Sequence, residues 1–183
     1  VKYIVQTAES IFVLTHNNWE WILINDNSSQ NEEEELNPFL KDKRVKLISN
    51  EGDGIVDALN TGMSLVSGDF VTRMDADDIM PANKLELLLA TLLDSNADIA
   101  TGKVQYFSEN ATISDGYQKY ENWLNERVEE LDFDAYIYRE CTVASANWLI
   151  RANTLNKYGA FKGLEYPEDY DLMFRFYQHK LKI

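Results

Sequence analysis

Residues 54 to 80 read GIVDALNTGMSLVSGDFVTRMDADDIM, a stretch in which a helix, a strand and an acidic turn follow one another directly. Apolar residues recur at helical spacing from Ile55 to Val66, and the glycines at 54 and 68 mark the ends of the predicted helix. The segment Phe70–Met74 has the length of a short strand and runs into Asp75-Ala76-Asp77-Asp78. A strand that follows a helix and ends in carboxylates is typical of α/β folds, which bind ligands at the carboxyl ends of their strands.

Strands alternate with helices on both sides of this stretch. The expected helices are residues 1–12, 85–93 after Pro81, 117–131 and 168–179, and the expected strands are 19–25, 45–49, 99–107 and 146–150. Strands separated by helices of this length pair in parallel and carry helices on both faces of the sheet. We therefore expect one domain with an α/β fold in three layers, α/β/α, around a mostly parallel central sheet.

The composition excludes several classes of protein. Hydrophobic residues make up 45% of the 183 residues and aromatic residues 12%, which is too much apolar surface for a disordered chain. The formal net charge of −14 repels nucleic acid and anionic lipid headgroups over most of the surface. The densest run of charge, Glu32 to Glu35, is expected to be solvated in the first turns of a helix rather than to bind metal.

Cysteine usage and hydropathy indicate the compartment. Cys141 is the only cysteine, so an internal disulfide is impossible and a reducing, cytoplasmic compartment is the simplest interpretation. The strongly apolar run at 85–93 is about half as long as a membrane span. Neither a spanning helix nor a signal peptide is expected from this sequence.

Carboxylates stand at three places where a ligand could bind. Asp26 ends the strand 19–25, Asp75 and Asp77 follow the strand 70–74, and Glu168 and Asp169 begin the last helix. Carboxylates two residues apart on extended backbone point to one side, and Mg²⁺ or Mn²⁺ takes one or two such ligands beside phosphates and water. Each acid also has a structural alternative: an Asx turn at the first site, a helix cap at the second and a helix-dipole contact at the third.

The order of these motifs resembles that of a family 2 glycosyltransferase with the GT-A fold. The resemblance rests on WILINDNSS at 21–29, on the stretch at 54–80 and on YPEDYDLMFRF at 166–176, and it covers nearly the whole chain. It implies a single catalytic domain over residues 1–183, with a nucleotide-sugar-binding half at 1–100 and an acceptor and catalytic-base half at 101–183. It also implies transfer of a sugar from a nucleotide diphosphate sugar to an acceptor hydroxyl, with inversion.

The resemblance gives each of the five acids a role. Asp26 would bind the base of the donor, most often the uracil of a UDP-sugar. Asp75 would face the ribose or the diphosphate and would share with Asp77 a Mn²⁺ or Mg²⁺ ion that bridges the two phosphates. Asp169 would be the catalytic base, and Glu168 would help to position the acceptor or the base. These roles suit the chemistry, because a divalent ion stabilises the leaving diphosphate and a carboxylate can take the proton of the attacking hydroxyl.

The family also indicates partners. By resemblance they are a UDP-sugar donor and a saccharide or lipid-linked saccharide acceptor, in bacterial polysaccharide or glycoconjugate synthesis, in the cytoplasm or at the inner face of the membrane. No nucleic-acid partner is expected. Five aromatic residues of the second half either stack on acceptor sugars or pack in the core: Tyr106, Phe107, Trp123, Trp148 and Tyr166.

The chain departs from the family pattern in a few places. Relatives open with an apolar strand, whereas this sequence starts inside the first helix, so we expect such a strand ahead of residue 1 and a further segment after residue 183. Leu59 stands where many relatives have Arg, and Asn25 and Asn27 replace a more common Asp and Gly, which affects nucleotide selectivity. Two other interpretations stay open: a nucleotidyltransferase, which would need a basic Gly-rich loop, and a nucleotide-binding or regulatory domain without catalysis.

Overall fold

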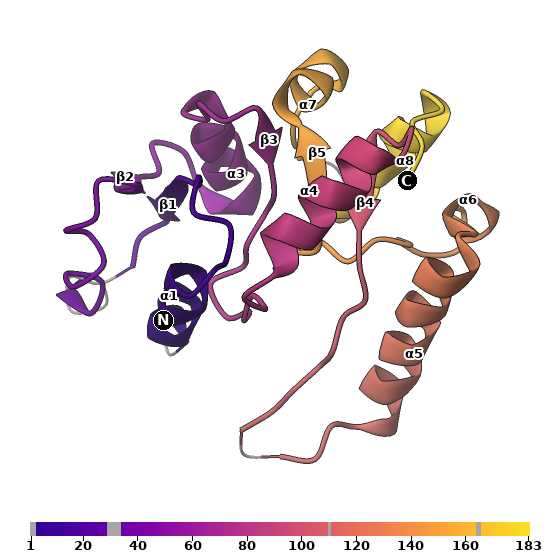
Figure 1. Ribbon diagram of the computed structural model, residues 1–183, viewed down its shortest axis with the longest axis horizontal. Helices are drawn as coiled ribbons and strands as arrows, with labels where there is room; N and C mark the ends of the chain where they lie inside the picture. The colour runs from indigo at the N-terminus through magenta and orange to yellow at the C-terminus, as the bar shows by residue number, and fades with distance from the viewer. Residues whose placement is uncertain (1–2, 29–33, 110, 164–165) are drawn as a thin grey trace.

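The computed structural model describes residues 3–28, 34–109, 111–163 and 166–183 of the chain. Helices and strands alternate along it, as the sequence predicts (Figure 1). In chain order the elements are α1 (Ile4–Phe12), β1 (Trp21–Asn25), β2 (Val45–Ser49), α3 (Gly54–Ser64), β3 (Phe70–Val71), α4 (Lys84–Asp94), β4 (Ile99–Thr101), α5 (Asp115–Glu130), α6 (Phe133–Tyr136), β5 (Trp148–Arg151), α7 (Ala152–Tyr158) and α8 (Glu168–Gln178).

Several bounds differ from the prediction. β3 has two residues and β4 has three, both shorter than expected, and α3 ends at Ser64. The short helices α6 and α7 were not predicted, because four and seven residues carry too little periodicity. The acidic run Glu32–Glu35 lies partly outside the described residues; Glu34 and Glu35 are exposed, which agrees with solvated side chains.

The strands form two hydrogen-bonded sheets. β1 and β2 run parallel, from Trp21 opposite Val45 to Asn25 opposite Ser49. In the second sheet β5 lies between β3 and β4 and is antiparallel to both, so β3 and β4 run in one direction. β5 does not follow the expected parallel order. The chain leaves the sheet at the end of β4, passes through α5 and α6, and enters β5 at the same end of the sheet (Figure 1). β5 must therefore run antiparallel to β4.

Helices cover both faces of the second sheet, as a three-layer fold requires. Neighbouring residues of a strand point to opposite faces. In β5, Trp148 belongs to the cluster that contains Met173 of α8, whereas Leu149 belongs to the cluster that contains Leu88 of α4. Figure 1 shows α4 crossing one face of this sheet. The other sheet is covered by α3, which packs on β1.

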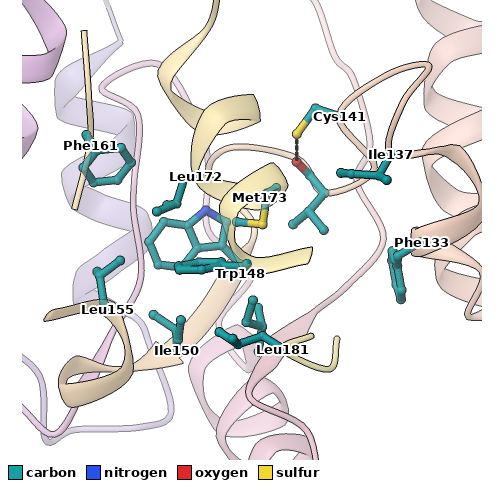
Figure 2. Packing of buried hydrophobic residues seen from close by; sticks show 13 residues of the cluster. Phe133, Ile137, Cys141, Trp148, Ile150, Leu155, Phe161, Leu172, Met173 and Leu181 are labelled. Carbon is teal, nitrogen blue, oxygen red and sulfur yellow. Dashed lines mark hydrogen bonds between the residues drawn. The ribbon is translucent and has the colours of Figure 1, made fainter. Parts of the chain in front are cut away.

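The largest core cluster surrounds Trp148 (Figure 2). Its side chain is buried beside Leu172 and Met173 of α8, with Ile150 and Leu155 close to the ring. Burial of side chains of this size contributes about 1.5–3 kcal/mol each to stability. The cluster therefore fixes α8, and with it the acids at the start of that helix, against the sheet.

After β4 the chain leaves the sheet and runs out along α5 (Figure 1). The side-chain amide of Asn125 donates to the C=O of Val104 at 2.9 Å and its oxygen accepts from the N–H of Val104 at 2.8 Å. The carboxylate of Glu121, one turn earlier on α5, accepts from the N–H of Tyr106. The predicted strand 99–107 is wrong beyond Thr101, because side chains of α5 take the backbone groups that a neighbouring strand would bind.

A cavity of about 710 Å³ lies between the two sheets. Ile22 and Ile24 of β1 line one side and Phe70 and Val71 line the other. Within the described residues, no backbone pairing joins β1 to β3 across this space. The cavity wall reaches Asp75, so it extends to the acidic turn.

Candidate active site

The acids Asp75–Asp78 form a turn beyond the end of β3. The N–H of Asp78 donates to the C=O of Asp75 at 3.2 Å, and Asp77 is the exposed acid of the turn. The N-cap of the following helix, α4, is Asn83. The capping alternative for these acids is therefore wrong, and the exposed carboxylate of Asp77 is available for another role.

Two hydroxyl side chains of α1 hold this turn in place. Thr7 Oγ1 lies 3.0 Å from the carbonyl oxygen of Ala76 and 2.8 Å from that of Asp78. Ser10 Oγ accepts from the N–H of Met80 at 3.0 Å. Both hydroxyl residues are buried, at 1% and 7% exposure. Neither hydroxyl residue was predicted, because a small polar residue on the apolar face of a helix carries almost no sequence signal.

Arg73 connects the acidic turn to the start of α8. Its Nε lies 2.7 Å from Asp75 Oδ1 and its Nη1 lies 2.7 Å from Glu168 Oε1. The Arg73 side chain is 8% exposed and that of Glu168 is 13% exposed, so this ion pair is largely shielded from water. Ser145 Oγ reaches the second oxygen of Asp75 at 3.4 Å. Two acidic motifs from opposite halves of the chain therefore share one guanidinium.

A second cation, Lys84, lies beneath the acidic turn. Burial lowers the pKa of this lysine to about 8, although the charges of Asp78 and Asp75 act in the opposite direction. Its Nζ donates to the C=O of Ala146 at 2.6 Å. The pKa of Asp78 is raised, first by burial and then by repulsion from Asp75 and Asp77. A divalent cation beside these acids would relieve that repulsion.

Asp169 stands in the first turn of α8, next to Glu168. Burial raises the pKa of Asp169, and the charge of Glu168 adds to this effect. The N–H of Tyr170, which donates to Asp169 Oδ1 at 2.8 Å, and the charge of Arg73 act in the opposite direction. A half-buried carboxylate with a raised pKa is a more effective proton acceptor than an ordinary surface aspartate.

The third acid of this motif, Asp171, is structural. It is 4% exposed and accepts from Arg175 Nε at 2.8 Å. Arg175 also donates to the carbonyl oxygens of Tyr158, Gly159 and Ala160. This network ties α8 to the end of α7, which explains the acid without any role in binding.

Asp26 follows the carboxyl end of β1. Its carboxylate accepts from Asn50 Nδ2 at 2.8 Å, at the end of the neighbouring strand. The Asx-type contact belongs to Asn25, whose side-chain oxygen accepts from the N–H of Ser28 at 2.7 Å. The structural alternative, an Asx turn formed by Asp26, is therefore wrong. The Asp26 side chain is exposed, and its carboxylate takes no part in the described part of the turn.

A smaller cavity of about 160 Å³ links the end of β1 to the acidic turn. Asn25 and Ser28 line it on one side, and Asp75 and Ala76 line it on the other. The two strand ends thus face a shared space, as expected from the carboxyl ends of strands in an α/β fold.

The acids of the turn suit a hard divalent cation. Asp75 and Asp77 offer carboxylate oxygens, and no hydrogen bond to the Asp77 carboxylate is formed within the described part of the chain. No cluster of three or more His, Cys, Asp or Glu that could hold a metal occurs among the described residues. This donor set fits an ion that takes one or two protein carboxylates and completes its shell with phosphate oxygens and water.

The five aromatic residues for which either core packing or sugar stacking was expected differ in their exposure. Trp148 is buried in the core at 2% exposure, whereas Phe107 and Tyr166 are about half exposed, at 48% and 50%. Tyr106 and Trp123 are half-buried. They belong to a row of rings along α5 in which Tyr120 stacks on Trp123 with centroids 5.9 Å apart.

The model of glycosyl transferase family 2 matches residues 1–159. The chain belongs to this family. The predicted membership of this family is thereby confirmed, whereas the motif at 166–176 lies beyond the matched residues.

Two bacterial relatives show how much of a family member the chain represents. The glycosyltransferase GlyG of Streptococcus pneumoniae serotype 4 is 32% identical over 142 residues, which cover 76% of this chain and 46% of that protein. WfgD of Escherichia coli, a UDP-Glc:alpha-D-GlcNAc-diphosphoundecaprenol beta-1,3-glucosyltransferase, is 33% identical over 108 residues, 58% of this chain and 42% of that protein. The chain thus spans less than half the length of these two relatives.

Solved structures of glycosyltransferases share the fold. The mannosyltransferase PcManGT of Pyrobaculum calidifontis, in complex with GDP-Man and Mn²⁺, superposes with a TM-score of 0.74 at 16% identity, over 98% of this chain and 49% of that one. TarS of S. aureus in complex with UDP-GlcNAc gives a TM-score of 0.70 at 16% identity, over 95% and 49%. The predicted GT-A fold is confirmed. None of the described helices is long and apolar enough to cross a membrane.

Proposed function

We propose that this chain carries the active site of an inverting glycosyltransferase, which moves a sugar from a nucleotide diphosphate sugar to an acceptor hydroxyl. The observation that carries the proposal is the bridge from Asp75 through Arg73 to Glu168, because it brings a donor-binding turn and a candidate base together. Residues 1–100 form the donor half in this proposal, and residues 101–183 form the acceptor and base half.

On the donor side, Asp77 and Asp75 hold Mn²⁺ or Mg²⁺, and the bound ion supplies Lewis-acid stabilisation of the leaving diphosphate. Asp26 binds the base of the nucleotide, next to the cavity that the end of β1 shares with the acidic turn. A UDP-sugar is the favoured donor, since one relative is named for UDP-Glc and one structural neighbour holds UDP-GlcNAc.

On the acceptor side, Asp169 is the general base and Glu168 helps to position it. The acceptor oxygen bonds to the anomeric carbon while the bond from that carbon to the diphosphate oxygen breaks, with its electron pair passing to the diphosphate. The hydroxyl proton passes to the Asp169 carboxylate. Attack on the face opposite the leaving group inverts the anomeric centre and needs no covalent enzyme intermediate.

The acceptor is a saccharide or a lipid-linked saccharide in this proposal. The name of WfgD, which specifies a sugar on diphosphoundecaprenol, supports the lipid-linked form. Such an acceptor places the reaction at the inner face of a bacterial membrane, in polysaccharide or glycoconjugate synthesis.

Replacement of the proposed base tests this function. With UDP-Glc, UDP-GlcNAc and GDP-Man as donors and Mn²⁺ present, the parent chain should release nucleotide diphosphate, and Asp169→Asn should lose about 10²–10⁴-fold in turnover while still binding the donor. The matched control is Asp115→Asn, which changes an exposed acid in the first turn of α5 and should leave turnover unchanged.

The outcomes separate the interpretations. Donor binding without turnover in the parent chain would favour a nucleotide-binding or regulatory domain. Full activity of Asp169→Asn would show that the base lies elsewhere.

A further inference from the structure

We propose that Arg73 is a positioning residue that sets the spacing between the donor-side carboxylates and the base on α8. The proposal rests on the proposed function and adds to it a residue that acts through its carboxylate partners. Arg73 acts through its two partners, Asp75 on the acidic turn and Glu168 on α8.

The shape of the guanidinium makes it suited to this task. Nε faces Asp75 and Nη1 faces Glu168, each at 2.7 Å, so two carboxylates are held on one planar group. The donors of a guanidinium have fixed relative directions, unlike those of a lysine ammonium. Glu168 is followed directly by Asp169, so the bridge sets the position of the base against that of the acidic turn.

The bridge is shielded from water at Arg73 and Glu168, whereas the Asp75 side chain is partly exposed, at 32%. The Arg73 side chain is 8% exposed, and removal of one partner from a shielded ion pair leaves an uncompensated charge. A second Arg–Asp pair of the same sequence separation, Arg44 with Asp42 at 2.7 Å, has side chains 31% and 25% exposed. Exposed pairs contribute little, so Arg44 provides a matched control.

Arg73 has opposite effects on metal binding and on turnover in this proposal. Its positive charge lies beside Asp75, so Arg73→Gln should leave Mn²⁺ affinity unchanged or raise it severalfold, because a repulsive cation is removed. Turnover should fall about 100-fold, since a small misplacement of reacting groups is enough for such a loss. A residue that only stabilised the fold would weaken both.

The test measures Mn²⁺ affinity by calorimetric titration, turnover and thermal unfolding for Arg73→Gln, Arg73→Lys, Glu168→Gln, the double variant and Arg44→Gln. Arg73→Lys keeps the charge, so it should keep parental Mn²⁺ affinity and still lose turnover. The losses of turnover in Arg73→Gln and Glu168→Gln should not add in the double variant. Arg44→Gln should match the parent in Mn²⁺ affinity and turnover, and it should unfold at a slightly lower temperature because the Arg44 guanidinium lies 3.7 Å from the centroid of the Trp19 ring.

Three results would overturn the role of Arg73: parental turnover in both Arg73 variants, a loss of Mn²⁺ affinity in parallel with turnover in a folded variant, or additive losses in the double variant. Absence of turnover in the parent chain itself, with every donor, would instead contradict the proposed function. The two failures are therefore distinguishable.

Discussion

Asp169 is the base in the proposed function, and the folded chain opposes its ionisation. Burial and the neighbouring Glu168 raise its pKa, and the N–H of Tyr170 offsets only part of this. Perturbed carboxylates of this kind concentrate at functional sites. The same environment means that the charged form of Asp169 reduces the stability of the folded chain.

The difference in stability between Asp169→Asn and the parent chain should therefore depend on pH, because Asp169 titrates in the parent. Because the folded-state pKa lies above the unfolded value, the folded chain binds more protons between the two, and its stability falls as pH rises through this window. Asparagine does not titrate and can still accept from the N–H of Tyr170. Urea unfolding followed by tryptophan fluorescence should find Asp169→Asn more stable than the parent at pH 7–8, with the advantage disappearing below about pH 4.

The control variant, Asp115→Asn, should change the free energy of unfolding in the direction opposite to that expected for Asp169→Asn. Asp115→Asn removes a charge that favours a helix N-terminus and should cost about 0.3–1 kcal/mol. A destabilised Asp169→Asn at neutral pH would mean that the folded chain stabilises the charged carboxylate.

At the level of elements, α1 both covers the fold and supports the acidic turn. Its apolar pattern predicted an amphipathic helix, and the helix is present at Ile4–Phe12. Its bonds from Thr7 and Ser10 to the segment 76–80 could not be predicted, because hydrophobic periodicity treats small polar residues as neutral. Hydrophobic periodicity predicts which face of a helix is buried, whereas the backbone that this face contacts is seen only in the structure.

Replacement of Thr7 tests this support. Thr7→Val keeps the shape of the side chain but removes the single hydroxyl hydrogen that the carbonyls of Ala76 and Asp78 share, so it should lower the free energy of unfolding by about 1–3 kcal/mol. It should also weaken Mn²⁺ binding, because the acidic turn loses its anchor. Both quantities are measured by denaturation and by titration.

Thr15→Val is the matched control. Thr15 donates to the C=O of Ala82 and to Glu86 but is exposed, so water can replace both bonds. We expect a change within about 0.5 kcal/mol and parental Mn²⁺ binding. Equal effects of the two substitutions would contradict an anchoring role for Thr7.

For the whole molecule, the sequence predicted which residues follow the ends of strands. It did not predict which segments far apart in the sequence contact each other. It placed Asp26 and Asp75 after strands, and both follow strands in the structure. It could not show that Arg73 pairs with Glu168, because a strand arginine has the same pattern whether exposed or bridging. It also missed the antiparallel direction of β5, which depends on where the excursion through α5 returns.

The cavity between the sheets leads to a final prediction. Trp21 N–H donates to Arg44 C=O and Asn25 C=O accepts from Asn50 N–H, so alternate residues of β1 bond to β2. The backbone groups of Ile22 and Ile24 therefore point to the cavity of about 710 Å³. We expect that an apolar strand placed in this space would bond to β1 and β3.

Hydrogen exchange can test the expectation residue by residue. In the 183-residue chain the amides of Ile22 and Ile24 should exchange much faster than that of Leu23, which faces β2. In a protein in which an apolar strand occupies the cavity, all three should be protected alike, and the free energy of unfolding should rise because apolar area on both sheets is buried. Strong protection of Ile22 and Ile24 in the 183-residue chain would show that the cavity is already closed, and an added strand would then have no edge to pair with.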